Sequence, residues 1–350
     1  MNLQQLLDLT IQRQASDLHL SVGYPPILRI HGELIPIPGS EPITPEQMDA
    51  ALVAMLNKSQ KEIFLENLEL DFSFELPNKG RFRVNLFRQK GYPAASLRLI
   101  PAIIPALSDL GFPDVVKKIP DLKQGFILVT GPTGHGKSTT LASFINQINL
   151  SRSEHILTIE DPIEYIYPVG KSLIDQREMF LDTKSWSNAL KAALREDPNV
   201  VLVGEMRDLE TISSAMTIAE TGHLVFATLH TNSAAQSIDR IIDVFPEIQQ
   251  PQIRLQLAST LEAILSIRLV PTINPGRTVA SEVLFATPAI RNIIREGKSH
   301  LIDNVIETSA EGGMQILERS LVDLVKQGKI TPETANRFAL RPGLLGKLLK

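Results

Sequence analysis

The chain has 350 residues, of which 43% are hydrophobic and 21% are charged, and its net charge is −4. This length and apolar content support a large core in more than one domain, and the mild negative charge argues against a general nucleic-acid-binding protein. Because cysteine is absent, disulfides, thiol catalysis and cysteine–zinc sites are excluded. The first residues lack a secretory signal pattern and the apolar runs are short. We therefore expect a cytoplasmic protein without direct membrane insertion.

The first hundred residues alternate short helical and strand patterns. Apolar residues at helical spacing predict helices over residues 2–14 and 45–56, the second of them starting with Thr44 and Pro45. Strand patterns cover residues 27–37, with a turn at Gly32, and residues 71–76 and 81–89. We predict an N-terminal α/β domain over residues 1–100 and a proline-rich linker over residues 101–120.

The pattern changes from Gln124 onward. Four short apolar runs follow, GFILVTG, HILTIED, NVVLVGE and HLVFATLH, and helical segments separate at least the first three. Strands that are buried on both faces read as continuous apolar runs, so this order predicts a parallel α/β sheet. After Ile248 the sequence favours helices. We therefore predict a second domain over residues 121–350 that ends in trailing helices.

Residues 131–138, GPTGHGKS, fit the phosphate-loop pattern between a predicted strand and a predicted helix. Glycines allow backbone N–H groups to turn toward phosphates. We expect Lys137 to reach the β- and γ-phosphates and the Ser138 hydroxyl to bind Mg²⁺. His135 is interpreted as a bystander inside the loop. The predicted nucleotide-binding residues are Gly131, Pro132, Thr133, Gly134, His135, Gly136, Lys137, Ser138 and Thr139.

Acidic residues end two of the predicted strands. Neighbouring parallel strands bring their carboxyl ends to one edge of a sheet, where phosphoryl transfer needs a metal and a positioned water. The candidates are Glu160, Asp161 and Glu164 after one strand, and Glu205, with Arg207 and Asp208 beyond it, after the next.

The position that usually carries the metal-associated acid of a phosphate-loop ATPase is Gly204, so we expect metal support from the neighbourhood of Asp161. An alternative role for Asp161 and Asp208 is to cap the helices that follow the two strands. Which of Glu160 and Glu205 polarises water stays open from spacing alone. His230 ends the fourth predicted strand, where a histidine is placed to sense the γ-phosphate.

Three arginines lie in the N-terminal domain. Arg81 and Arg83 share one face of a predicted strand, and Arg98 follows in ASLRLI. Pattern alone favours a solvated strand face for them. In ring ATPases, however, arginines from a neighbouring subunit stabilise charge in the transition state.

Four motifs occur in one order: GPTGHGKSTT, TIEDPIE, ALREDPNVVLVGEMRDLETI and AETGHLVFATLHTNSA. They resemble the Walker A loop, Asp box, atypical Walker B and His box of the secretion ATPases of type II secretion and type IV pili. Within that family, residues 15–34, 287–302 and 313–325 are similar to the pilus retraction ATPases. Pilus assembly ATPases carry a long extra N-terminal region and a four-cysteine zinc site. Because this sequence has no cysteine and only about a hundred residues before its phosphate-loop domain, within the usual size of one domain, we expect neither feature.

The resemblance implies a PAS-like N-terminal domain, a RecA-like C-terminal domain and a homohexameric ring that hydrolyses ATP with Mg²⁺. It implies that ATP turnover pulls pilin subunits out through the inner-membrane platform protein, at the cytoplasmic face of the inner membrane. The resemblance also implies roles for single residues. Lys137 and Ser138 would bind phosphate and Mg²⁺, and Glu160, Glu164 and Glu205 would prepare the water and the metal, with Glu164 as a second Mg²⁺ ligand. His230 would sense the γ-phosphate, and Arg83 and Arg98 would contact the nucleotide, with Arg195 and Arg207 as weaker candidates.

Two segments depart from the family pattern: HTNSAAQ, residues 230–236, and LSIRLVPTINPG, residues 265–276. The second departure is compatible with an accessory retraction ATPase that works beside a main motor, so a second retraction ATPase is a candidate partner. A DNA-translocating ATPase on the same core is an alternative of another class. The acidic charge and the lack of an aromatic and basic stripe argue against it.

Overall fold

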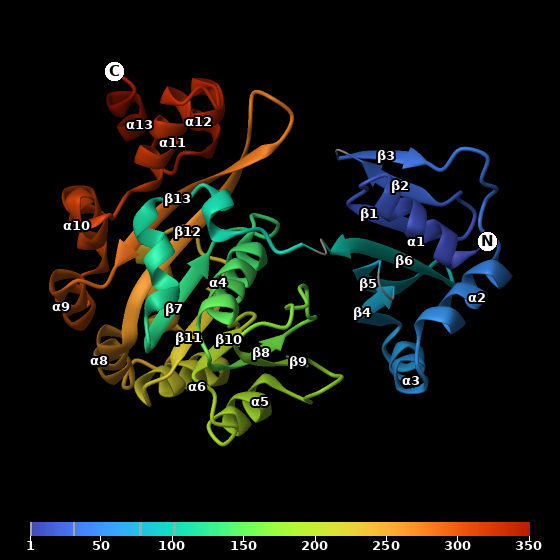
Figure 1. Ribbon diagram of the computed structural model, residues 1–350, viewed down its shortest axis with the longest axis horizontal. Coiled ribbons are helices and arrows are strands. Elements are labelled where there is room, and N and C mark those ends of the chain that lie inside the picture. Colours follow the sequence, from blue (N-terminus) through green and yellow to red (C-terminus); the bar gives the residue numbers. More distant parts are fainter. Residues whose placement is uncertain (1, 31, 77–78, 101–102) are drawn as a thin grey trace. The chain divides into compact units, whose positions relative to one another are not determined.

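The computed structural model describes residues 2–30, 32–76, 79–100 and 103–350 and contains two compact units (Figure 1). Unit 1 comprises Met1–Ile103 and Asp161–Ile166, and unit 2 comprises Ile104–Glu160 and Tyr167–Lys350. Each unit has its own sheet and its own core, which confirms the mixed α/β class. Pro101 and Ala102, the start of the predicted linker, lie outside the described residues.

Unit 1 is built on a six-stranded antiparallel sheet in the order β3-β2-β1-β6-β5-β4. The strands are β1 (Asp17–Ser21), β2 (Ile27–Ile30), β3 (Glu33–Pro36), β4 (Glu69–Leu76), β5 (Gly80–Gln89) and β6 (Tyr92–Ile100), and the helices are α1 (Leu3–Gln12), α2 (Pro45–Met55) and α3 (Lys58–Asn67). The predicted helices are confirmed, and Thr44 forms a capping box with Gln47 at the start of α2.

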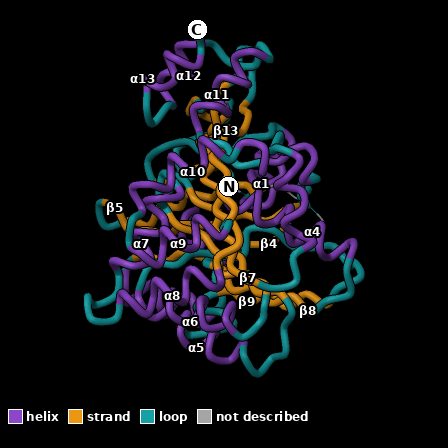
Figure 2. The backbone as a smooth tube through the Cα atoms, turned by 90° about the vertical axis from the view of Figure 1, so that its left-hand side faces the viewer, coloured by secondary structure: helices purple, strands orange, loops and turns teal. Residues whose placement is uncertain are grey.

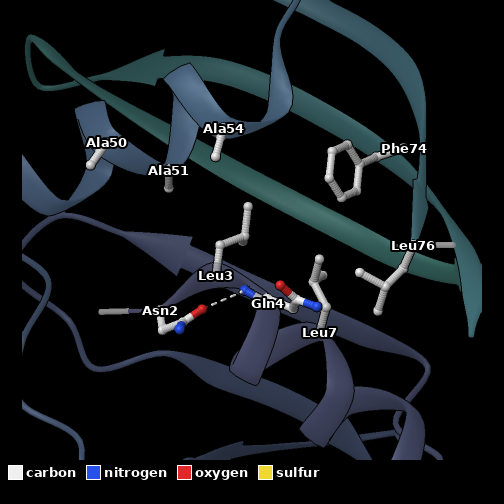
Figure 3. A pocket seen from close by; sticks show the side chains of 9 residues that line it. All are labelled: Asn2, Leu3, Gln4, Leu7, Ala50, Ala51, Ala54, Phe74 and Leu76. Atoms are coloured by element: carbon white, nitrogen blue, oxygen red, sulfur yellow. Dashed lines mark hydrogen bonds between the residues drawn. The ribbon is translucent and has the colours of Figure 1, made fainter.

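Alternation along the strands divides the sheet of unit 1 into an apolar and a polar face. Leu18, Phe82, Val84 and Leu97 are fully buried in a core that also takes side chains from the three helices. A pocket remains between α1, α2 and β4, lined by Leu3, Leu7, three alanines of α2, Phe74 and Leu76 (Figure 3). The opposite face carries the charged residues discussed below.

Unit 2 contains a seven-stranded sheet in the order β13-β12-β7-β11-β10-β8-β9, parallel except for β13. Its strands are β7 (Gly125–Thr130), β8 (His155–Glu160), β9 (Leu173–Glu178), β10 (Val200–Val203), β11 (Leu224–Leu229), β12 (Leu261–Pro271) and β13 (Arg277–Phe285). The four apolar runs recognised in the sequence are β7, β8, β10 and β11, so the predicted parallel sheet is confirmed.

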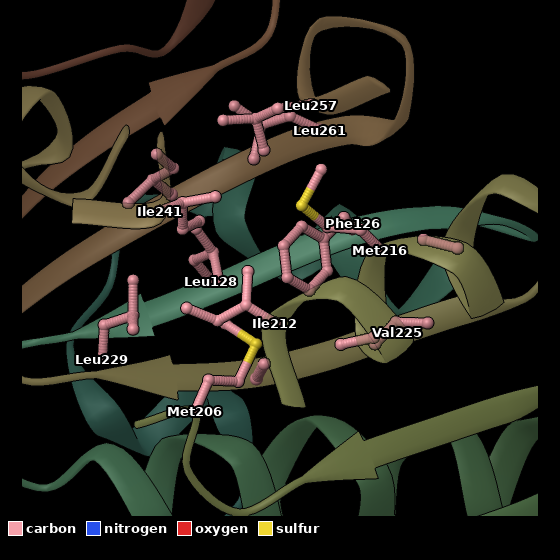
Figure 4. Close-up of a cluster of buried hydrophobic side chains, with 14 of the residues drawn as sticks. Phe126, Leu128, Met206, Ile212, Met216, Val225, Leu229, Ile241, Leu257 and Leu261 are labelled. Carbon is pink, nitrogen blue, oxygen red and sulfur yellow. The ribbon is translucent and has the colours of Figure 1, made fainter. Parts of the chain in front are cut away.

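Helices cover both faces of this sheet. They are α4 (Lys137–Ser151), α5 (Trp186–Ala193), α6 (Leu209–Glu220), α7 (Ala234–Asp243), α8 (Gln250–Thr260), α9 (Pro288–Glu296), α10 (Ile302–Thr308), α11 (Leu317–Lys326), α12 (Pro332–Phe338) and α13 (Pro342–Leu348). Phe126 and Leu128 of β7 lie in one hydrophobic cluster with side chains of α5–α9 (Figure 4). Figure 2 shows the backbone of these helices and of the strands. Ile127 and Val129, on the opposite face of β7, pack with α4. The phosphate-loop strand is therefore buried on both sides.

The prediction of mostly helical structure after Ile248 was wrong for β12 and β13, which form a long hairpin on β7. The strand β12 lies between two neighbours and is buried on both faces, so its residues show no period-two alternation. Helix α8 also runs directly into β12 at Thr260 and Leu261, without glycine or proline to mark the boundary. The helical pattern predicted near the end of the chain is confirmed by α11 and α12.

Residues 107–121 form two 3₁₀ segments, Leu107–Leu110 and Asp114–Asp121. Their side chains Leu107, Val116 and Ile119 are buried with α4 and β7, so most of the segment expected to be a linker packs on the core of unit 2. Across the part of the chain that the structure describes, no helix has the length and apolar character that crossing a bilayer would require.

Candidate nucleotide and catalytic site

The phosphate loop connects β7 to α4 at the carboxyl edge of the sheet. Gly131, Gly134 and Gly136 have φ angles of +143°, +78° and +89°, which residues with a Cβ atom rarely adopt. This path turns the loop around the N-terminus of α4, where backbone N–H groups and the helix dipole attract anions. Lys137 is buried, and its Nζ atom donates to the carbonyls of Gly131 at 2.8 Å and Pro132 at 3.0 Å.

Glu160 ends β8 at the same edge of the sheet. Its Oε1 atom accepts hydrogen bonds from Thr158 Oγ1 at 2.7 Å and from Gln176 Nε2 at 3.4 Å. Thr158 lies two residues earlier on β8, and Gln176 lies on the neighbouring strand β9. These contacts orient the carboxylate at the strand end, which is the arrangement that a metal or water site requires.

Gly204 follows β10 and explains why the second acid is displaced by one residue. Its N–H donates to the carbonyl of Ile159 at 2.8 Å. A Cβ atom at position 204 would lie 3.2 Å from the same oxygen and 3.3 Å from Cα of Glu160. A side chain at this position would crowd the end of β8. Glycine permits this close approach, and the acid follows as Glu205.

Glu205 joins the end of β10 to the His box. One carboxylate oxygen lies 2.6 Å from Arg207 Nη2, and the other lies 3.6 Å from Nε2 of His230. The other ring nitrogen of His230 lies 3.4 Å from the Thr133 hydroxyl in the phosphate loop. The phosphate loop, the Walker B glutamate and the His box therefore meet at one edge of the sheet, and Asp208 caps α6 as predicted.

The other predicted residues lie elsewhere. Arg83 and Arg98 are cross-strand neighbours on β5 and β6 in unit 1. Arg98 Nε lies 2.9 Å from Asp17 Oδ1. Glu164 also belongs to unit 1, and its Oε1 atom lies 3.9 Å from Arg83 Nη1. Arg195 is exposed on unit 2. The contribution of these residues to the nucleotide site stays a prediction.

Sequence reasoning missed two contacts of the phosphate loop. Thr133 was predicted only as a part of the loop, but its hydroxyl meets His230. His135 was interpreted as a bystander, but its Nδ1 atom accepts a hydrogen bond from the N–H of Leu269 on β12 at 3.1 Å. The second contact was not predictable because β12 itself was not recognised as a strand.

The chain matches the family model of the type II/IV secretion system protein over residues 71–337. It is 46% identical to the type IV pilus retraction ATPase PilT of Pseudomonas aeruginosa over 342 residues, which covers 98% of this chain and 99% of PilT. It is 40% identical to the type IV pilus ATPase PilU of the same organism, covering 96% of this chain and 88% of PilU. The crystal structure of the pilus retraction motor PilT with bound ADP superposes with a TM-score of 0.91, at 45% identity and 99% coverage of both chains.

These similarities extend over both units and include the motifs that meet at the edge of the sheet of unit 2. The site therefore lies in an ATP-hydrolysing enzyme, and the chain belongs to the PilT family of type II/IV secretion ATPases.

Proposed function

We propose that this chain is the ATP-driven motor of type IV pilus retraction. The observation that carries the proposal is the convergence of Lys137, Glu205 and His230 at one sheet edge, in a chain that matches a retraction ATPase over nearly its whole length. In this proposal Lys137 binds the phosphates, Glu205 and Glu160 orient the attacking water, and His230 senses the γ-phosphate through the Thr133 side of the loop.

Mg²⁺ bound with ATP would neutralise charge on the phosphate oxygens. The donor set fits this metal because Ser138 supplies a hydroxyl at the start of α4 and Glu160 and Glu205 supply carboxylates at neighbouring strand ends. Mg²⁺ prefers such hard oxygen ligands and usually binds through one or two carboxylates and the substrate phosphates. Glu164 remains a candidate second ligand from unit 1.

The proposed assembly is a homohexameric ring at the cytoplasmic face of the inner membrane, acting on the pilus platform protein. In this ring Arg83 and Arg98 of the N-terminal domain, residues 1–100, reach nucleotide held by the ATPase domain, residues 121–350. The motor pulls pilin subunits out of the pilus, and a second retraction ATPase is a candidate partner. The accessory PilU-type role is the second candidate function, favoured by 40% identity to PilU but weakened by the higher identity to PilT.

The test is to count surface pili by electron microscopy on source cells that carry Lys137→Ala. Loss of the phosphate-binding ammonium should stop the motor, so the cells should carry many pili and lose surface motility. A matched control is Lys123→Ala, because Lys123 is exposed at the opposite end of β7 and its partner Glu154 keeps a closer ion pair with Arg152. Bald cells would mean that the motor assembles pili, and an unchanged count would indicate an accessory paralogue or a different machine.

A further inference from the structure

Strand β12 continues beyond the end of β7. The pairing of these strands stops at Thr130 and Ser266, whereas β12 runs on to Pro271 beside β13. Beyond Thr130, the phosphate loop lies along the edge of β12 that β7 pairs with earlier in the strand. A Cβ atom on Gly131 would lie only 2.3 Å from the carbonyl oxygen of Ile267, so the loop backbone passes directly against β12.

His135 fastens the phosphate loop to this extension. Its Nδ1 atom accepts the N–H of Leu269, a backbone donor that β7 no longer reaches. An accepting Nδ1 requires the neutral ring with its proton on Nε2. Burial first, and then the nearby charges of Arg268, Lys137 and Arg277, lower the pKa of His135 and so favour this neutral form.

Arg268, the preceding residue on β12, joins two other parts of unit 2. Its Nη2 atom lies 3.3 Å from Oδ1 of Asn232, two residues after His230. Its Nη1 atom donates to the carbonyl of Phe338, the last residue of α12, at 2.9 Å. One guanidinium therefore connects the His-box loop to the C-terminal helices, and the two segments that depart from the family pattern meet at this contact.

A second network fixes the C-terminal helices next to it. Arg341, at the N-terminus of α13, forms ion pairs at 2.9 Å with Glu318 of α11 and with Asp303 of α10. Glu318 is fully buried and also accepts the N–H of Arg341 at 2.8 Å. Because these helices are held to one another, the tie from Arg268 to α12 positions all of α11–α13 relative to the His box.

We propose that Arg268 is a positioning residue that couples the His-box loop to the C-terminal helices α11–α13. The arrangement of His230 around the γ-phosphate then depends on the docking of these helices, and nucleotide state changes their docking in return. A planar guanidinium directs Nη1 and Nη2 toward two separate acceptors in fixed directions, a geometry that a lysine ammonium or a glutamine amide does not reproduce. This coupling rests on the role proposed above for His230 at the γ-phosphate, but not on which machine the motor serves.

The test uses the purified full-length protein with Arg268→Gln, and with Arg337→Gln as a matched control that removes an exposed guanidinium from the same end of α12. We expect Arg268→Gln to lower kcat by at least about fivefold, the lower end of ordinary coupling between sites, and to leave KM for ATP within about threefold. Hydrogen exchange of residues 332–349 should differ between ADP and a non-hydrolysable ATP analogue in the unmodified protein and in the control, but not in Arg268→Gln.

Asn232→Ala keeps the proposal testable if Arg268→Gln folds poorly, because it removes the other end of the same contact. It should produce the same loss of kcat and of nucleotide-dependent exchange, and the double variant should lose no more than either single variant. Additive losses, or nucleotide-dependent exchange that persists in the variants, would overturn the coupling. A fall in kcat that is explained by a lower melting temperature of the variant would also overturn the coupling.

Discussion

The carboxylate of Glu205 and the imidazole of His230 face each other at the carboxyl edge of the sheet, with 3.6 Å between Oε2 and Nε2. They come from the ends of adjacent parallel strands, β10 and β11. Since His230 also approaches Thr133 of the phosphate loop, one side chain lies between that loop and the glutamate. Glu160 lies apart from this pair, on β8, with hydrogen bonds from Thr158 and Gln176.

Glu205→Gln should reduce kcat by roughly 10²- to 10⁴-fold, the range for loss of a general base. The amide keeps the shape of the side chain but cannot accept the proton of water, so ATP binding should persist. Glu160→Gln is the matched comparison at the neighbouring strand. Phosphate release and binding of a fluorescent ATP analogue measure the two effects. A larger kcat loss in Glu160→Gln would assign water activation to β8 instead.

Gly131→Ala and Gly134→Ala should differ sharply although both lie in the phosphate loop at positive φ. At position 131 the new methyl group would lie 2.3 Å from the Ile267 carbonyl, whereas nothing lies within 4 Å of it at position 134. Gly134→Ala therefore adds backbone strain alone, about 1 kcal/mol. Gly131→Ala also forces the loop away from β12. We expect it to lose nucleotide binding and several degrees of melting temperature.

Thermal melts and titration with a fluorescent ADP analogue measure both variants under the same conditions. Equal losses in the two variants would mean that the loop can move away from Ile267 without cost, and that its contact with β12 does not hold the phosphate-binding conformation.

Much of unit 2 was predictable because its chemistry is local in the chain. The phosphate loop lies between a continuous apolar run and a helix, so residues 125–151 carry all of the signals that define that part of the site. The ends of β8, β10 and β11 follow from the same reasoning, because parallel strands share one carboxyl edge.

Contacts between distant segments were not predictable in the same way. His135 meets Leu269 and Arg268 meets Phe338 only because β12 extends past β7. A strand that is buried on both faces and joined directly to a helix carries no period that identifies it. In unit 1 the strand pattern showed that Arg81 and Arg83 share a face, but the opposition of Arg83 and Arg98 required the register of β5 and β6.

The buried carboxyl of Glu282 should make stability depend on pH. Burial, its largest influence, raises its pKa to about 7 from 4.5; Asp303 and Glu318 add to this, while the N–H of Ala234 and the charge of Arg341 oppose it. Between pH 4.5 and 7 the folded protein therefore binds more protons than the unfolded chain, so the free energy of unfolding falls as pH rises. This loss is complete above about pH 7.

Glu282→Gln keeps an acceptor for the N–H of Ala234, which donates to Oε1 at 2.7 Å, but cannot ionise. Its stability relative to the unmodified protein should increase between pH 5 and pH 8, by at most roughly 3 kcal/mol. Denaturant unfolding at several pH values measures the difference, and Glu307→Gln on the exposed face of α10 is the control. A difference that is independent of pH would contradict the raised pKa.

Arg83→Ala and Arg98→Ala should separate a role in turnover from a role in folding. The Asp17 side chain is only 6% exposed, and Arg98 holds it at 2.9 Å, with Arg29 at 3.7 Å on its other side. Arg98→Ala leaves this carboxylate with the Ser16 hydroxyl, which donates to Oδ2 at 2.8 Å, and with the more distant Arg29. Unit 1 should therefore lose roughly 1 kcal/mol. The longer 3.9 Å contact joins Arg83 and Glu164 side chains that are 39% and 34% exposed, so Arg83→Ala should leave the melting temperature unchanged.

If both arginines reach nucleotide in the assembled ring, both variants should also lower kcat by about tenfold or more. Loss of an arginine that stabilises charge in phosphoryl transfer usually lowers kcat by more than this. Turnover is measured well below the melting temperature of each variant, and Asp17→Asn tests the structural part separately. Arg98→Ala with normal turnover and the same stability loss as Asp17→Asn would make Arg98 a structural partner of Asp17. A loss of turnover confined to Arg83→Ala would assign the nucleotide contact to Arg83.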